Sequence, residues 1–258
     1  MTNRCSSSVL FCVVFVFVVH TATAASLLSE ASVLDLSTSD SCSDSTSLPG
    51  VTVAAECAVG GLVGSASSFV TYGSAGTFAF LQGSDGTPAL AEGFARWSDL
   101  YLLPVEAEFV SYTFAVDGAT TNNGLDRVFG QISLFGAFAG VLFETDVFGD
   151  TIVTTPLIPA DTVREGDVST IFRSQALILT STGAIVSGQA DFRGGLRLTS
   201  VDLFDVSRNP IVGVVTGESG TVYPTSDTAI PEPASMGLLA TGLFLLGANA
   251  KRSRPPQR

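Results

Sequence analysis

The sequence alternates most regularly in the stretch Glu108-Phe109-Val110-Ser111-Tyr112-Thr113-Phe114-Ala115-Val116. Successive side chains of a β-strand point to opposite faces, so the large apolar residues at 110, 112, 114 and 116 fall on one face, and the small or polar residues between them fall on the other. This pattern predicts a strand with one face in a hydrophobic core and the other face closer to water.

Comparable short runs, rich in β-branched and aromatic residues, recur along the chain and are separated by Gly, Asn and Asp. They cover residues 51–59, 65–72, 77–82, 94–102, 127–135, 138–148, 170–180, 184–192, 196–206 and 211–216. Short strands joined by turns at this spacing are typical of β-sandwiches and jelly rolls. We therefore predict an all-β protein with an antiparallel, jelly-roll-like β-sandwich over residues 51–224.

Three segments depart from this pattern. The alternation slips out of phase twice in residues 196–206, which predicts a β-bulge near Thr199 and Ser200. Residues 25–50 are rich in Ser, Thr and Asp, and we expect a loosely ordered N-terminal segment there, apart from a short strand at 32–36. Residues 225–230 are expected to form a linker.

The first 24 residues have the pattern of a secretory signal peptide. Arg4 provides a basic start, residues 9–19 form an apolar helix core, and Ala22-Thr23-Ala24 provides a small-residue cleavage site. We expect signal peptidase to cut after Ala24. The alternative is an uncleaved anchor.

Residues 231–258 combine three features in order. Pro231-Glu232-Pro233 is followed by 17 uncharged residues, 234–250, and then by a tail, 251–258, that contains Lys251, Arg252, Arg254 and Arg258. As a helix, the uncharged segment would be about 25 Å long, which is short for a hydrocarbon core of about 30 Å. The basic cluster should stay cytoplasmic, so the preceding domain should lie outside. An ordinary tail anchor and a buried core helix are the alternatives.

This ordered trio resembles the PEP-CTERM sorting signal of exported bacterial proteins. The resemblance implies that an exosortase, an integral-membrane processing enzyme, recognises Pro231, Glu232 and Pro233 and removes the tail. It also implies a transient inner-membrane stage, followed by delivery to the cell surface or to an extracellular polysaccharide matrix.

The segment between the two signals is strongly acidic. All 24 Asp and Glu residues lie between residues 25 and 233, together with seven arginines and no lysine, which gives a net charge of −17 (7 − 24). Such a surface repels nucleic acid and anionic lipid, so we expect neither as a partner.

Two cysteines remain after the signal peptide is removed. Cys42 and Cys57 would meet in an oxidising compartment and could close a loop of about 15 residues, worth roughly 3 kcal/mol. We predict this disulfide; the alternative is two unpaired thiols. The spacing excludes a CxxC redox or zinc motif.

Catalytic chemistry is limited because the one histidine, His20, lies in the signal peptide. This excludes Ser-His-Asp and Cys-His sites from the exported domain and leaves carboxylates. Two i, i+2 pairs could place both acids on one strand face, as a glycosidase requires: Glu106 with Glu108, and Glu144 with Asp146. A solvated strand face explains either pair equally.

Two further sets of residues are candidates for binding. Asp117 and Asp126 lie in acidic turns that could bind calcium through oxygen ligands, although an ordinary hairpin turn accounts for the same residues. Trp97, with Phe94 and Tyr101, could stack on a sugar ring or belong to the core.

The sequence therefore predicts an exported, non-enzymatic surface or matrix component with a structural or adhesive role and no cofactor. The alternatives are a carbohydrate-binding module of an exopolysaccharide matrix and a carboxylate-dependent glycosidase.

Overall fold

The structure, a computed structural model, describes residues 25–36, 41–59, 62–83, 88–179 and 185–225. These residues form 17 strands and one short helix, α1 (Ala160–Arg164). The strands are β1 (Ser26–Asp35), β2 (Ser41–Thr46), β3 (Val53–Val59), β4 (Leu62–Thr71), β5 (Ser74–Gly83), β6 (Ala89–Asp99), β7 (Tyr101–Leu102), β8 (Phe109–Asn123), β9 (Arg127–Gly136), β10 (Gly140–Val147), β11 (Gly149–Thr154), β12 (Ile158–Pro159), β13 (Val168–Ile178), β14 (Val186–Phe204), β15 (Pro210–Ile211), β16 (Val215–Gly217) and β17 (Val222–Tyr223).

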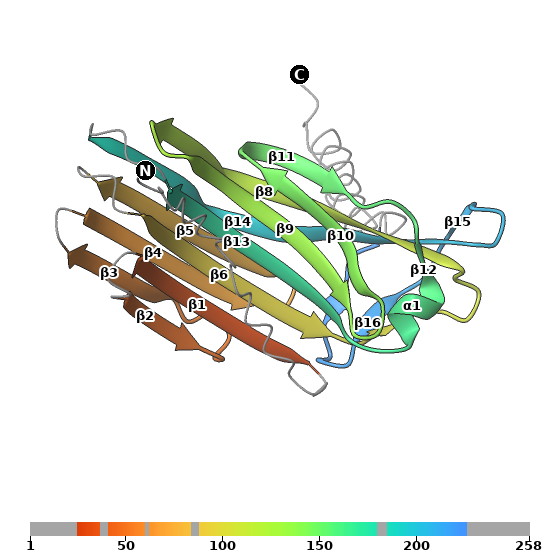
Figure 1. Ribbon diagram of the computed structural model, residues 1–258. Coiled ribbons are helices and arrows are strands. Elements are labelled where there is room, and N and C mark those ends of the chain that lie inside the picture. Colours follow the sequence, from red (N-terminus) through yellow and green to blue (C-terminus); the bar gives the residue numbers. More distant parts are fainter. Residues whose placement is uncertain (1–24, 37–40, 60–61, 84–87, 180–184, 226–258) are drawn as a thin grey trace, which may run out of the picture.

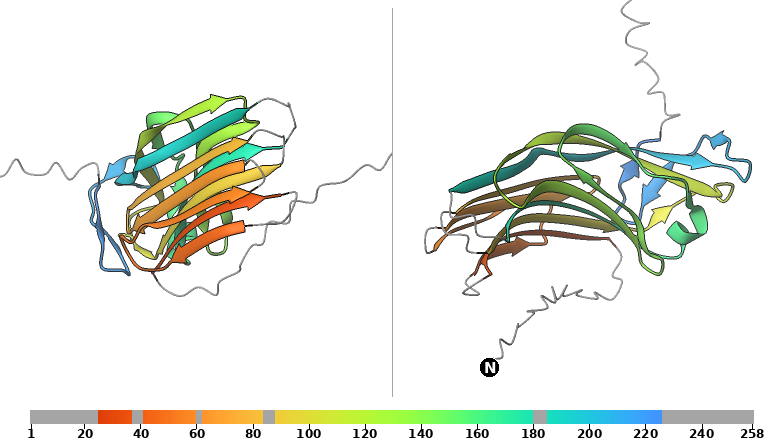
Figure 2. Two further views of the ribbon diagram at one scale, coloured as in Figure 1. Left: turned by 90° about the vertical axis from the view of Figure 1, so that its left-hand side faces the viewer. Right: turned by 45° about the horizontal axis from the view of Figure 1, so that its top comes forward.

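The strands form two large sheets and one small sheet. A six-stranded sheet has the order β10-β9-β13-β6-β1-β2, and the second large sheet has the order β11-β8-β14-β5-β4-β3, with β12 and β15 paired to its members. The two large sheets lie one over the other, and a three-stranded sheet, β17-β16-β7, lies at one end of them (Figures 1 and 2). Every pairing is antiparallel. The prediction of an all-β protein with antiparallel sheets is confirmed.

The core lies between the two large sheets and contains many small side chains. Phe172 of β13 and Phe192 of β14 meet across it edge to face, with ring centroids 5.6 Å apart. The buried alanines of the two large sheets are Ala31, Ala55, Ala66, Ala75, Ala79, Ala89, Ala91, Ala95, Ala176 and Ala190. Small side chains on facing strands allow the two backbones to approach closely.

The backbones approach closely at Gly93, in the middle of β6. A Cβ atom at this position would lie 2.4 Å from the carbonyl oxygen of Ser67 in β4 and 2.6 Å from that of Phe78 in β5. Both distances are too short for a real contact, so any larger residue would push the sheets apart. Nearby, the hydroxyl groups of Thr77 and Ser174 form a buried hydrogen bond of 2.6 Å between the layers.

The apolar face of the alternating stretch is buried as the sequence predicts, but Ser111 on the other face is buried too, where its hydroxyl donates a 2.9 Å hydrogen bond to the carbonyl oxygen of Thr155. Val110, Tyr112, Phe114 and Val116 of β8 are all buried, while Thr113 and Ala115 are half-buried. The register between β14 and β8 shifts between Leu198 and Ser200, which confirms the bulge predicted there.

The prediction of a loosely ordered N-terminal segment is wrong, although the short strand predicted at 32–36 falls in β1 except for its last residue. Residues 26–46 contribute β1 and β2 to the six-stranded sheet, so the β domain begins at Ser26 and not at residue 51. Small residues obscure the alternation in β1, where Leu27, Ser29, Ala31 and Val33 face the core. The predicted runs 184–192 and 196–206 are also one strand, β14, because the chain stays paired with β8 across its irregularities.

The described domain begins and ends at the same end of the sheets. Ser26 pairs with Ser98 at the end of β6, and the adjacent Asp99 accepts a 2.6 Å hydrogen bond from Tyr223 of β17. In Figure 1 the end of β6 lies beside β16. Within the described ranges, no helix is long and apolar enough to cross a membrane. The predicted signal peptide (1–24), linker (225–230, except Thr225) and sorting signal (231–258) lie outside those ranges.

Candidate binding face

The outer face of the six-stranded sheet carries a row of side chains that crosses all six strands. Strand register places Ser45, Glu30, Phe94, Arg173, Gln131 and Asp146 side by side, from β2 at one edge to β10 at the other. We call these six residues the polar row. Phe94 is its one apolar member, so a ligand lying across the strands would meet polar groups on both sides of an aromatic ring.

Half of the polar row is held by hydrogen bonds between side chains. Nε of Arg173 donates to Oε1 of Gln131 at 2.5 Å, and Nε2 of Gln131 donates to Asp146 at 3.1 Å and to Glu144 at 3.2 Å. Arg127 forms an ion pair with Asp146 at 2.7 Å. Arg127 therefore compensates the charge of Asp146, and the Gln131 amide, held by Arg173, fixes both carboxylates.

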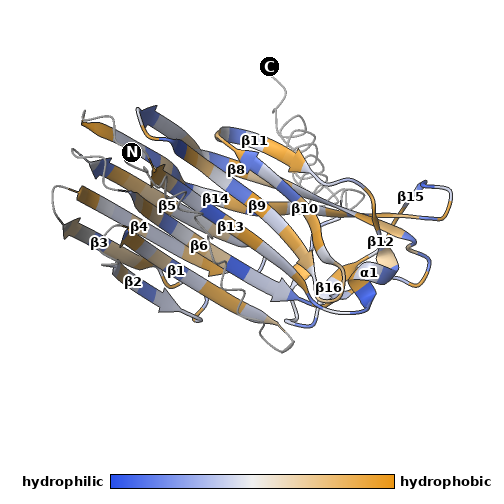
Figure 3. Ribbon diagram, viewed as in Figure 1, coloured by the Kyte–Doolittle hydropathy of each residue, from blue (hydrophilic) through white to orange (hydrophobic). Residues whose placement is uncertain are grey.

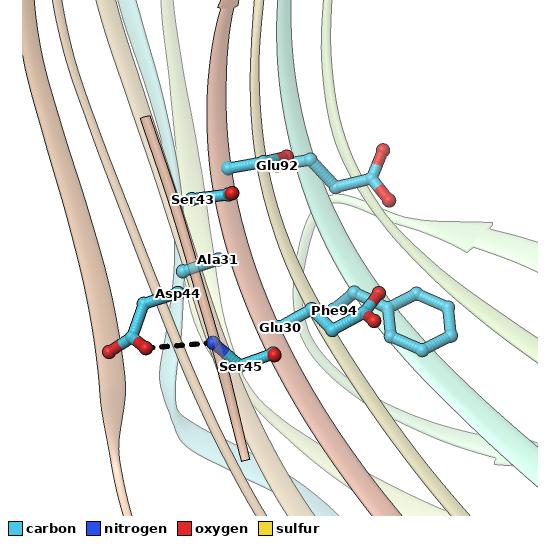
Figure 4. Close-up of a pocket in the computed structure, with 8 residues that line it drawn as sticks. Glu30, Ala31, Ser43, Asp44, Ser45, Glu92 and Phe94 are labelled. Atoms are coloured by element: carbon cyan, nitrogen blue, oxygen red, sulfur yellow. Dashed lines mark hydrogen bonds between the residues drawn. The ribbon is translucent and has the colours of Figure 1, made fainter. Parts of the chain in front are cut away.

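The other half opens into a hollow over β1, β2 and β6. Its volume is about 380 Å³, and it is lined by Glu30, Ala31, Ser32, Ser43, Asp44, Ser45, Glu92 and Phe94. Figure 4 shows the carboxylates of Glu30 and Glu92 on the same side of the sheet, with that of Glu30 beside the Phe94 ring. The carboxylates of Glu30 and Glu92, the hydroxyls of Ser43 and Ser45 and the Phe94 ring therefore face the hollow, and none of its lining residues is basic. The Asp44 carboxylate points to the other side of β2.

The surroundings of Glu92 alter its ionisation. Burial raises its pKa, because a charged carboxylate loses hydration there, and the nearby charge of Glu30 raises it further. A hydrogen bond donated by Nε2 of Gln175 and the charge of Arg173 act in the opposite direction. The raised pKa of Glu92 therefore reflects mainly the burial of its carboxylate.

Two phenylalanines differ in how they are presented on this face. Phe94 is half-buried and lines the hollow. Phe129 is only 2% exposed, although it lies outside the main core, because the Arg127 guanidinium covers its ring at 4.1 Å from the centroid. Phe94 is therefore the aromatic surface that a ligand in the hollow could reach.

The carboxylate pairs proposed from sequence have different environments. Glu144 and Asp146 do share a strand face, and both accept hydrogen bonds from Gln131. Glu106 and Glu108 lie in the turn between β7 and β8, where the i, i+2 rule for strands does not apply, so that pairing is wrong.

The calcium candidates lie at different places. Asp117 is in β8 beside Gly194, whereas Asp126 follows the end of β8 and accepts a hydrogen bond from the backbone N–H of Leu179 at 2.6 Å. The strand from Asp117 to Asn123 alone extends about 20 Å at the usual rise per residue. In the described ranges, no group of three or more His, Cys, Asp or Glu side chains could hold a metal.

The aromatic and cysteine candidates also have defined positions. Trp97 and Tyr101 are completely or almost completely buried, so of the three aromatic residues only Phe94 faces a possible ligand. Cys42 in β2 is disulfide-bonded. The side chain of Cys57 lies outside the described set, so its pairing with Cys42 stays a prediction, as does the role of Pro231, Glu232 and Pro233.

Sequence reasoning missed the two carboxylates of the hollow. Glu30 and Glu92 are 62 positions apart and come together only because β1 pairs with β6. The available signal was the set Leu27, Ser29, Ala31 and Val33 at alternate positions, which had to be recognised first as the buried face of a strand. Comparison of the chain with known protein families, with curated proteins and with solved structures finds no significant match.

Proposed function

We propose that this protein is exported, sorted to the cell surface through its C-terminal signal, and binds extracellular polysaccharide with the outer face of its six-stranded sheet. The polar row and the adjoining hollow are the observation that carries the binding proposal. Polysaccharides are long and rich in hydroxyl groups, and a polar row across six strands offers partners to several consecutive sugars. A protein that binds polysaccharide without cleaving it has an adhesive role and not an enzymatic one.

The surroundings of Phe94 support a sugar as the occupant of the hollow. An aromatic ring can pack against the apolar face of a pyranose, while carboxylates and hydroxyls accept or donate hydrogen bonds at its edge. Glu30 and Glu92 provide acceptors, and Ser43 and Ser45 provide hydroxyls. These groups are fixed on paired strands, so little ordering is needed on binding.

The charge of the hollow limits the class of polysaccharide that can bind there. Glu30 and Glu92 direct their carboxylates to this side and none of the lining residues is basic, so a chain of uronic acids would be repelled. Neutral and amine-bearing polysaccharides fit this potential, since an ammonium group gains from nearby carboxylates.

The binding proposal includes the finer fold assignment. We infer that the two facing sheets with a shared core form a β-sandwich of the jelly-roll type, which leaves one sheet surface free for a ligand. The common core and the interlayer hydrogen bond of Thr77 with Ser174 support this assignment.

Retention of the exported protein on immobilised polysaccharides tests the proposal. We expect retention on dextran or chitosan and none on alginate. Phe94→Ala and Glu30→Gln should each weaken binding about tenfold, which corresponds to roughly 1.4 kcal/mol. The matched controls are Ile152→Ala and Glu56→Gln, which change exposed residues of the other large sheet. Equal retention of all variants, or no retention on any polysaccharide, would contradict the proposal.

One observation favours glycosidase activity as the second candidate. Glu30 pairs with Phe94, and Ser32 pairs with Glu92, so the two glutamates are diagonal neighbours, about 7–8 Å apart between backbones. The raised pKa of Glu92 suits a general acid that protonates the leaving oxygen while Glu30 acts on the opposite side. Release of reducing ends from a bound polysaccharide, abolished by both Glu30→Gln and Glu92→Gln, would favour this candidate over binding alone.

A further inference from the structure

Exposed apolar side chains lie on the small sheet and on the segment 212–214 that leads into β16. Val212, Val214 and Thr216 follow one another at alternate positions, and Thr216 pairs with Leu102 on one side and Val222 on the other. Four of these five residues are large and apolar, and each of the four is between 56% and 76% exposed. We call these five residues the valine face.

The side chains on the opposite face of the small sheet are buried in the core. Val215, Tyr223 and Tyr101 are 3% exposed or less, and the rings of Tyr101 and Tyr223 are in contact, with centroids 4.8 Å apart. The sheet is therefore anchored on one side and has an uncovered apolar surface on the other. Figure 3 shows the small sheet, marked by β16, beside α1 at this end of the molecule.

The valine face lies only a few residues before the C-terminal segment 234–250, and this short separation indicates which surface it contacts. Val222 is three residues before Thr225, the last described residue, and residues 226–233 then separate the domain from the uncharged segment 234–250. Eight extended residues span at most about 29 Å. If segment 234–250 is inserted in a bilayer, the valine face cannot be far from the lipid surface.

We propose that the valine face rests on the lipid surface of the membrane while the C-terminal tail is inserted there. This inference relies on the sorting part of the proposed function. Four exposed aliphatic side chains bind a bilayer weakly by themselves, but a short tether holds them at a high effective concentration beside it. The contact would end when the tail is removed, because the tether is then lost.

The charge of the residues around the valine face determines which lipid headgroups this face can contact. Glu218, in the turn between β16 and β17, and Glu106, after β7, are exposed near the valine face. Negative groups at this position disfavour an anionic surface, so the contact fits zwitterionic headgroups.

Fluorescence quenching by bilayer lipids tests the contact. Trp97 is completely buried and gives a constant background, so an introduced tryptophan can report on its own surroundings. The chain without residues 1–24 would be reconstituted through its tail into phosphatidylcholine vesicles that contain brominated acyl chains. We expect strong quenching of Val214→Trp and little quenching of Ile152→Trp, whose site is 73% exposed on β11.

Two outcomes separate this inference from the proposal on which it relies. If the chain remains in the vesicles after carbonate extraction but both tryptophans are quenched equally weakly, the inference is wrong and the membrane tail stands. If the chain is extracted, the membrane tail and the inference both fail. Replacing a third of the lipid by phosphatidylglycerol should reduce quenching of Val214→Trp, and increased quenching would contradict the assignment to zwitterionic lipid.

Discussion

The hydroxyl of Tyr223 donates a 2.6 Å hydrogen bond to Oδ2 of Asp99, a carboxylate with no exposed surface. Ser219 donates two more bonds to the same carboxylate, one from its backbone N–H at 3.1 Å and one from its hydroxyl at 2.6 Å. Asp99 ends β6 of the six-stranded sheet, whereas Ser219 and Tyr223 belong to the β16–β17 hairpin. One buried carboxylate therefore attaches the last described strands to the main body.

The first prediction concerns this attachment. Tyr223→Phe removes one charge-assisted hydrogen bond and should lower the free energy of unfolding by about 1.5–3 kcal/mol. Urea unfolding followed by fluorescence measures the change. Val222→Ala, at the neighbouring exposed position, should change stability by less than about 0.5 kcal/mol. Equal effects of the two substitutions would show that the hydrogen bond contributes little.

The second prediction concerns the contact between the large sheets. Gly93→Ala places a Cβ atom against the carbonyl oxygens of Ser67 and Phe78, so the sheets must separate locally. We expect a loss of about 1–3 kcal/mol in thermal or urea unfolding, as for other overpacked cores. Gly149→Ala is the control, because its Cβ would lie 3.7 Å from its nearest neighbour, which is an ordinary contact. A Gly93→Ala variant as stable as this control would contradict the close approach of the sheets.

The third prediction concerns the disulfide of Cys42. If its partner is Cys57, peptide mapping without reduction should recover one cross-linked fragment that contains both residues. Cys57→Ser should then lower stability by about 3 kcal/mol, the value expected for a loop of about 15 residues. Recovery of Cys57 as a free thiol would refute the pairing.

The fourth prediction concerns the pH dependence of stability. Since burial raises the pKa of Glu92 above its ordinary value of 4.5, the folded state binds a proton more readily than the unfolded state. This group therefore favours folding below pH 4.5, and the benefit is lost as the pH rises through its folded-state pKa. Asp167 has a raised pKa as well, so wild type should be compared with Glu92→Gln. The variant should lose less stability than wild type between about pH 4 and pH 7; parallel pH profiles would contradict the assignment.

The sequence predicts the strands that combine large side chains with regular alternation. β8 and the bulge in β14 are predicted because both leave a phase signal in apolar residues. β2 and the first part of β1 are missed, because β2 contains only small and polar residues and a small and charged stretch, Ser29 to Ala31, interrupts the apolar residues of β1. Their strand conformation depends on the pairing of β2 with β1 and of β1 with β6. The hollow was missed for the same reason, because Glu30 and Glu92 come together through that pairing.

The last prediction concerns the sorting signal, which lies outside the described residues. Proline at 231 and 233 removes backbone donors and favours an extended chain, a form that a membrane protease can bind more readily than a helix. Replacing Pro231, Glu232 and Pro233 by alanine should leave full-length protein in the inner membrane, which immunoblotting of cell fractions detects. Lys251→Gln is the control and should be processed normally, because it changes one tail charge and leaves the motif intact. Unchanged processing and release of the triple variant would refute recognition of the Pro-Glu-Pro motif.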